Sequence, residues 1–241
     1  MPPPTINSKQ TRTNSQWTLI SLNVNGLNLP IKICRLTDWV SFCCVQETHF
    51  NFKDRYYLRV IVWEKIFQSN GPKKQALVAI LISNKLDFKL KSIKRDEEGH
   101  FILITGKGYQ DEVSILNIYA PNTKAPTFVN ETLLKLKPHM KPHIVYSRRL
   151  QHPLSPLDRT TRQKLNKETK DLKDVMTQLS LTDIYRTFHP NTKEYTFFSE
   201  PHGTFSKIDH IVGNKANFHR NKRIKITPSF LSDHHALKLE F

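Results

Sequence analysis

Short apolar runs alternate with polar turns along this chain, and the pattern predicts an α/β protein. Strands are predicted where residues alternate or form a brief apolar run bounded by turn residues. They are residues 17–23, 42–45, 78–82, 101–104, 113–119, 143–146, 181–185, 195–198, 207–212 and 236–241. Helical spacing predicts helices over 31–39, 128–136 and 160–179. We therefore expect two mixed β-sheets packed face to face with helices outside.

The N-terminal segment differs in composition from the remainder of the chain. Residues 1–16 are rich in Pro, Thr, Asn and Ser, so we expect a disordered polar tail followed by one domain over 17–241. The tail lacks the apolar core of a signal peptide, and no apolar run approaches the ~20 residues that cross a bilayer. The cysteines, Cys34, Cys43 and Cys44, form neither a disulfide framework nor a zinc spacing. They are expected to be reduced thiols of an intracellular protein.

The net charge of the chain indicates what kind of partner it binds. Lys and Arg number 37 against 21 Asp and Glu, which gives a net charge of +16 and a pI near 9.8. Such an excess favours a polyanionic partner, with a soluble basic protein as the alternative. A basic run near the C-terminus is the candidate phosphate contact, unless it is only a solvated face. Its residues are Lys215, Arg220, Lys222, Arg223 and Lys225.

Polar residues able to bind metal, phosphate or a proton follow several predicted strands. Glu47 ends the apolar run 42–45, where a carboxylate suits Mg²⁺, although a solvated glutamate capping a strand is the alternative. An Asp beside a His can orient the imidazole, and Asn and Tyr donate to phosphate oxygens. Taken singly, each of these residues could be present only because its type is common in turns. Together they suit phosphodiester hydrolysis, and the remaining ones are Asn23, Asn25, Tyr119, Asn122, Thr196, Asp209 and the segment 232–235.

Several longer stretches carry a resemblance to a known family. They read LNVNGLN, CCVQETH, ILNIYAPNT, LDRTTRQKLNKET, DIYRTFHP, YTFFS, SKIDHIVG and LSDHHALKLE. Over 17–241 the chain resembles the endonuclease/exonuclease/phosphatase superfamily, which includes exonuclease III and the apurinic endonucleases. It is most similar to the LINE-1 retrotransposon endonuclease domain. The resemblance implies a four-layer α/β sandwich that nicks DNA with Mg²⁺ (or Mn²⁺), in the nucleus; we expect a monomer.

The same resemblance implies roles for individual residues. Glu47 and Asn23 resemble the metal-side ligands, and Tyr119 and Asn122 the phosphate contacts. Asp209 resembles a residue that builds the site. The Asp233–His234 pair resembles the catalytic dyad. The residues that resemble a DNA-facing surface are Asn25, Arg159, Thr196, Ser206 and Ser232.

One segment departs from the family. Where the family has Gly-Asp-Phe-Asn-Thr-Pro, this chain reads Arg-Arg-Leu-Gln-His-Pro over 148–153. Arg149 replaces the Asp that positions or deprotonates the attacking water, and Gln151 replaces an Asn that donates to phosphate. The link before Cys43 is also shorter than in the family, which can strain the strand that presents Glu47. We expect impaired cleavage; the alternatives are a non-catalytic DNA- or RNA-binding module and an unstable product.

Overall fold

The computed structural model describes residues 17–26, 40–49, 63, 65–69, 71, 78–108, 111–121, 123–141, 144–149, 153–161, 165–228 and 232–241. Four predictions fall outside these residues. They are the polar tail over 1–16, the helix over 31–39, and the two site residues Asn122 and Gln151.

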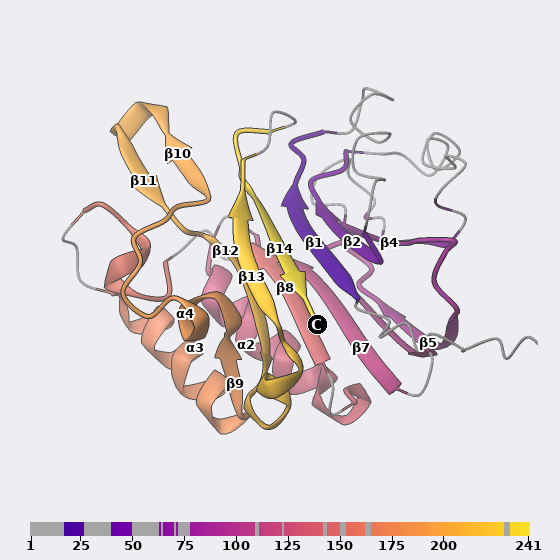
Figure 1. The fold of residues 1–241 in the computed structure, drawn as a ribbon. Coiled ribbons are helices and arrows are strands. Elements are labelled where there is room, and N and C mark those ends of the chain that lie inside the picture. Colours follow the sequence, from indigo (N-terminus) through magenta and orange to yellow (C-terminus); the bar gives the residue numbers. More distant parts are fainter. Residues whose placement is uncertain are drawn as a thin grey trace, which may run out of the picture.

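Two six-stranded sheets form the body of the protein (Figure 1). The first sheet has the order β13(Arg223–Thr227), β14(Ala236–Glu240), β1(Thr18–Asn23), β2(Phe42–Gln46), β4(Val78–Ile82) and β3(Lys65–Ser69). The second has the order β5(Phe88–Arg95), β6(Phe101–Gly108), β7(Asp111–Tyr119), β8(Ile144–Arg149), β12(Asp209–Asn214) and β9(Leu181–Asp183). A separate hairpin pairs β10(Phe197–Ser199) with β11(Thr204–Ser206).

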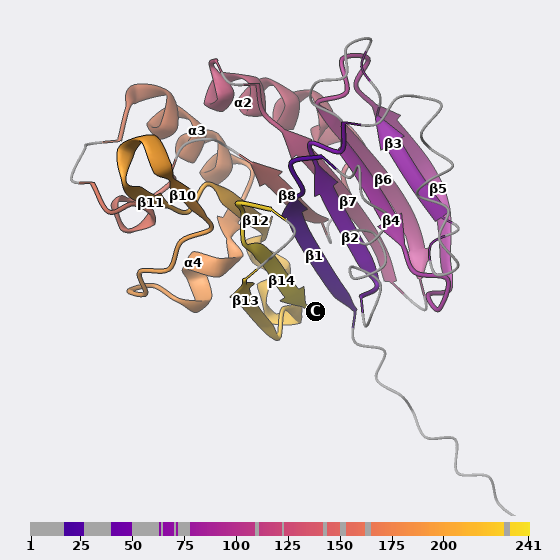
Figure 2. The same cartoon turned by 90° about the horizontal axis from the view of Figure 1, so that it is seen from above.

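The strand residues alternate between the two faces of each sheet, as the pleat requires. On β7 and β12, Ile115 and Ile211 point into the core between the sheets, and Leu116 and Val212 point to the opposite face. That opposite face is covered by α2(Ala125–Leu136) and α3(Lys167–Gln178) (Figure 2). The predicted sandwich of two sheets with helices outside is therefore confirmed.

The remaining helical segments are short. The helix α4(Ile184–Phe188) lies at one end of the sandwich, where it packs against edge strands of both sheets. In the described residues, 3-10 helices connect other elements: η2(Lys137–His139), η3(Pro156–Asp158) and η4(Glu200–His202) have three residues each, and η5(Lys215–Arg220) has six. No helix in the described part of the chain is both long and apolar enough to span a membrane.

Several predicted elements have other boundaries, and for two of them a helix cap explains the difference. The helix predicted over 160–179 begins only at Lys167, because Asn166 caps it by accepting from the Thr169 amide at 2.9 Å. The segment before it pairs instead with the hairpin, where Arg159 bridges Ser206. The strand predicted over 181–185 stops at residue 183. There Asp183 caps α4 through the Arg186 amide.

The short link before Cys43 leaves β2 in a regular position. The strand pairs in parallel with β1 from Leu19↔Phe42 to Asn23↔Gln46, and all five of its residues are buried. At its start, the Ser41 amide donates to the Thr18 carbonyl at 2.9 Å. The strand that presents Glu47 therefore keeps its register.

Candidate active site

Six strands bring their polar ends to one edge of the sandwich, which we call the site edge. In the first sheet β1 and β2 run parallel and end there, while β14 runs antiparallel to β1 and begins there. In the second sheet β7 and β8 end there, and β12 begins there. Residues from distant parts of the sequence thereby meet, as the pattern of polar residues at strand ends predicts.

The first-sheet half of the site edge is formed by Asn23 and Glu47. Asn23 ends β1 opposite Gln46, and Glu47 follows directly with a φ of 54°. A left-handed backbone costs a residue other than glycine of order 1–3 kcal/mol, and such strain is concentrated at functional positions. Asn23 is buried, its Oδ1 accepts from the Asn25 amide at 3.0 Å, and its Nδ2 has no partner in the described residues. Glu47 is half-buried and Asn25 is exposed.

The second-sheet half is one row of three paired residues. Tyr119 ends β7 and is paired with Arg149, the last residue of β8. Arg149 is paired on its other side with Asp209, the first residue of β12. Position 149 therefore lies between Tyr119 and Asp209 in the sheet, and both of those side chains are largely buried.

His234 joins the two sheets through Asp209. Its ring Nδ1 lies 2.7 Å from Asp209 Oδ2, and the two side chains are 1% and 6% exposed. A carboxylate only accepts, so Nδ1 carries the hydrogen and donates it. The other ring nitrogen, Nε2, is buried with no partner in the described residues. The ring also stacks on Phe197 of the hairpin, with centroids 4.7 Å apart.

The partner predicted for His234 is wrong. Asp233 is exposed and accepts from the half-buried Ser232 at 3.0 Å, and Ser232 Oγ in turn accepts from the His234 amide. Adjacent residues entering a strand point to opposite faces, so Asp233 cannot reach the ring that Asp209 contacts.

Thr196 does not lie on an exposed DNA-facing surface as predicted. Its side chain is fully buried, and Oγ1 accepts from the amides of Ile208 and Asp209 at 3.2 and 3.3 Å. Its carbonyl accepts from the His235 amide. Thr196 therefore fixes both members of the Asp209–His234 pair through the backbone. Arg159 and Ser206, which bridge each other at the base of the hairpin, are half-buried.

Two amide side chains that the sequence analysis did not select connect the sheets near the site edge. Gln46 Nε2 donates to Asn117 Oδ1 at 2.6 Å, and Asn117 Nδ2 donates to the carbonyls of Val45 and Ala79 at 2.9 Å. Gln46 precedes Glu47, and Asn117 lies two residues before Tyr119. These bonds therefore fix the spacing between the two halves.

A second polar cluster lies on the opposite face of β12, and we call it the buried charge cluster. Asp158, Asp183 and His210 are the types of residue that bind metals, with ligand atoms within 4.8 Å of one another. However, the fully buried Lys207 places its ammonium 2.9 Å from both Asp183 and His210 Nδ1 and 3.6 Å from Asp158. The ammonium thus supplies the positive charge that a metal would bring, so this cluster fits a structural role.

The pKa shifts of Asp183 and His210 agree with a structural role for the buried charge cluster. Burial alone would raise the pKa of Asp183, but the Lys207 ammonium and His210 outweigh it and hold that pKa far below its usual range. Burial, followed by the Lys207 charge, lowers the pKa of His210. The aspartate is therefore charged and the histidine neutral at pH 7.

Comparison with solved structures identifies the architecture. An AP endonuclease, LMAP, from Leishmania major matches with a TM-score of 0.76 at 14% identity, over 93% of this chain and 87% of that one. The catalytic domain of Xenopus laevis APE2 matches with a TM-score of 0.77 at 17% identity, over 92% and 90% of the two chains. This chain has the AP endonuclease fold. The endonuclease domain of TRAS1, a telomere-specific non-LTR retrotransposon, matches with a TM-score of 0.71 at 13% identity, over 92% and 97%. No family model matches the sequence.

Within this fold, the basic run near the C-terminus lies away from the site edge. β12 begins at the site edge with Asp209, and η5 follows its far end at Lys215. Six strand residues span about 20 Å. Arg223 of the same run bonds to Glu240 at the far end of β14. Nucleic acid bound at the site edge therefore does not reach this run without extending along the sandwich.

Proposed function

We propose that this chain is a DNA phosphodiesterase domain of the LINE-1 endonuclease type whose hydrolytic activity is impaired. The observation that carries the proposal is the buried Asp209–His234 pair at the site edge, with a buried Nε2 that has no partner in the described residues. The names of the structural neighbours, which include an AP endonuclease and a retrotransposon endonuclease domain, favour DNA as the substrate. The net charge of +16 agrees with a polyanion.

The chemistry assigned to the pair follows from its hydrogen bonding. Asp209 holds Nδ1–H of His234, so the ring presents Nε2 to a bound group. When the ring is protonated, Nε2–H donates to a phosphate oxygen and offsets the negative charge that develops in the transition state. Tyr119 and the Asn23 amide are the candidate donors to the remaining phosphate oxygens. Phe197, stacked on the ring, limits its rotation.

A divalent cation fits the first-sheet half of the site edge. Glu47 and Asn23 offer carboxylate and amide oxygens, which Mg²⁺ prefers, although Asn23 Oδ1 already accepts from the Asn25 amide. When bound, Mg²⁺ polarises a phosphate oxygen and neutralises its charge. Glu47 would be the principal ligand. We therefore expect Glu47→Ala to weaken Mn²⁺ binding in a calorimetric titration.

Impairment is proposed from the residue type at position 149. The position pairs with both Tyr119 and Asp209, where the family carries an aspartate that orients or deprotonates water. The arginine at position 149 cannot act as a base, and it replaces the negative charge of an aspartate with a positive one. Positioned general bases typically contribute ~10²–10⁴-fold to rate, so their loss leaves little turnover.

A basic nucleic-acid-binding remnant is the second candidate, favoured by Arg149 together with the +16 charge. Two measurements on the unaltered chain test the proposal: duplex DNA binding by fluorescence anisotropy, and nicking of supercoiled plasmid in Mg²⁺. We expect binding with little nicking. Robust nicking that His234→Ala abolishes would contradict the impairment, and absence of binding at low salt would contradict both candidates.

A further inference from the structure

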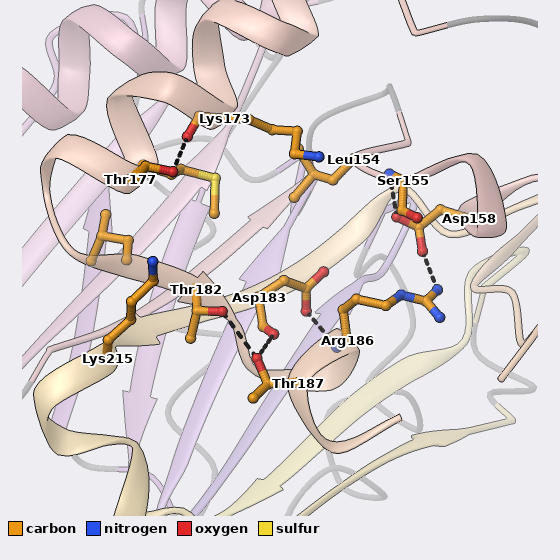
Figure 3. Close-up of a pocket in the computed structure, with 12 residues that line it drawn as sticks. Leu154, Ser155, Asp158, Lys173, Thr177, Thr182, Asp183, Arg186, Thr187 and Lys215 are labelled. Carbon is orange, nitrogen blue, oxygen red and sulfur yellow. Dashed lines mark hydrogen bonds and ion pairs between the residues drawn. The ribbon is translucent and has the colours of Figure 1, made fainter. Parts of the chain in front are cut away.

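A pocket beside the buried charge cluster is not used by the proposed function. It lies between α3, β9, α4 and the start of η5 and has a volume of about 300 Å³ (Figure 3). This is the lower end of the range for small-molecule sites. We propose that it binds a small organic phosphate, such as a sugar phosphate.

Two lysines at the rim supply the positive charge. Lys173 approaches from α3 and Lys215 from the start of η5, and both side chains are exposed (Figure 3). Neither ammonium has a hydrogen bond or ion pair with any of the described residues. Two ammonium groups that line one pocket without a partner among the described residues favour a ligand with two negative charges, and a phosphate monoester carries nearly two at pH 7.

The acidic residues of the pocket do not cancel this charge. Asp183 accepts from Lys207 and the Arg186 amide, and Asp158 accepts from Arg186 and the Ser155 amide. Asp158 and Asp183 are thereby balanced by Lys207 and Arg186. The charge left for a ligand is that of the two rim lysines.

The three threonine hydroxyl groups of the pocket present acceptors rather than donors. Thr177 donates to the Lys173 carbonyl at 2.9 Å, and Thr187 donates to the Asp183 carbonyl at 2.8 Å. Because the Thr187 hydrogen is used, Thr182 must be the donor in its 3.0 Å contact with Thr187. The lone pairs of Thr182 and Thr177 remain for a ligand that itself carries hydroxyl groups.

Part of the lining is apolar. Leu154, Met176 and Leu181 are buried and line the pocket beside the threonines. A carbon skeleton placed there loses contact with water while its hydroxyls face Thr182 and its phosphate faces the lysines. This combination distinguishes an organic phosphate from inorganic phosphate, which could use only the lysines.

The test is an NMR titration of the labelled chain with ribose 5-phosphate, inorganic phosphate and ribose. We expect ribose 5-phosphate at millimolar concentration to shift the amide signals of Leu181, Thr182 and Thr187, and to bind more tightly than either fragment. Lys173→Gln with Lys215→Gln should weaken its affinity about tenfold, since two exposed charge contacts are lost. The matched control, Lys170→Gln with Lys222→Gln, removes two exposed lysines that do not line the pocket and should leave the affinity unchanged.

Thr182→Val separates the hydroxyl contribution from the charge. It should weaken ribose 5-phosphate and leave inorganic phosphate unaffected. The proposal is overturned if no signal shifts, if the lysine substitutions do not weaken binding, or if inorganic phosphate binds as tightly as the ester. Displacement of the ester by a DNA duplex, dependent on the same two lysines, would assign the pocket to the nucleic-acid backbone instead and would also overturn it.

Discussion

Lys207 is the residue whose replacement should affect stability most clearly. It is fully buried, its ammonium lies 2.9 Å from Asp183 Oδ2, and methionine keeps most of its volume while removing the charge. Asp183 would then retain only the neutral His210 and the Arg186 amide as partners. Breaking a buried ion pair in this way typically costs ~3–5 kcal/mol, because one charge is left unpaired. We expect Lys207→Met to lose about that much in urea unfolding at pH 7.

The pH dependence identifies the cause. In the unaltered chain the pKa of Asp183 is depressed, so its carboxylate stabilises the fold above the unfolded pKa of ~3.9 and this contribution is lost as pH falls toward the folded value. In Lys207→Met, burial without the ammonium raises that pKa. The destabilisation should therefore shrink between about pH 7 and pH 5, as the carboxyl takes up a proton.

The control for this substitution is Arg223→Met, which removes an exposed partner of Glu240 and should hardly move the unfolding midpoint. A loss no larger than in this control would refute the reasoning. So would a loss that is the same at both pH values, because the unpaired carboxylate would then not be its source.

Three further results are expected. Asn117→Leu should lose about 3 kcal/mol or more in urea unfolding, because three buried hydrogen bonds, one from Gln46 and two to carbonyls, would be lost; a loss below about 1 kcal/mol would contradict the bridge between the sheets. Burial raises the pKa of the Cys43 thiol to about 12, so mass spectrometry should find it unmodified by iodoacetamide at pH 8 until urea is added. Affinity for duplex DNA should fall ~10³-fold or more between about 50 and 200 mM salt if at least six phosphates are contacted, and a flat response would exclude such contacts.

The central strands could be predicted from the sequence because their hydrophobic pattern is unambiguous. Val78–Ile82 is buried on both faces, so it reads as a continuous apolar run, and β1, β2 and β7 carry similar signals. The edge strands β5 and β13 were missed. In FKLKSIKR and RIKIT, lysine and arginine alternate with few apolar residues, which suits an exposed edge and weakens the strand signal.

The candidate site could be predicted only in part. Asn23, Glu47 and Asp209 were selected as polar residues at strand ends, and the structure places all three at the site edge. The partner of His234 required the register of β12 and β14, which separate that residue from Asp209 by 25 positions in the chain. The burial of Lys207 could not be predicted either, since a lysine at the start of a predicted strand is usually exposed.

The central claim is that the site edge forms a hydrolytic site silenced at position 149. The most direct measurement compares plasmid nicking in Mg²⁺ by Arg149→Asp/Gln151→Asn with the same protein carrying His234→Ala. The account predicts that the repaired protein nicks ~10²-fold or more faster than the unaltered chain, and that loss of His234 abolishes the gain. A repaired protein that is folded by circular dichroism but does not nick, or one that nicks equally well without His234, would contradict it.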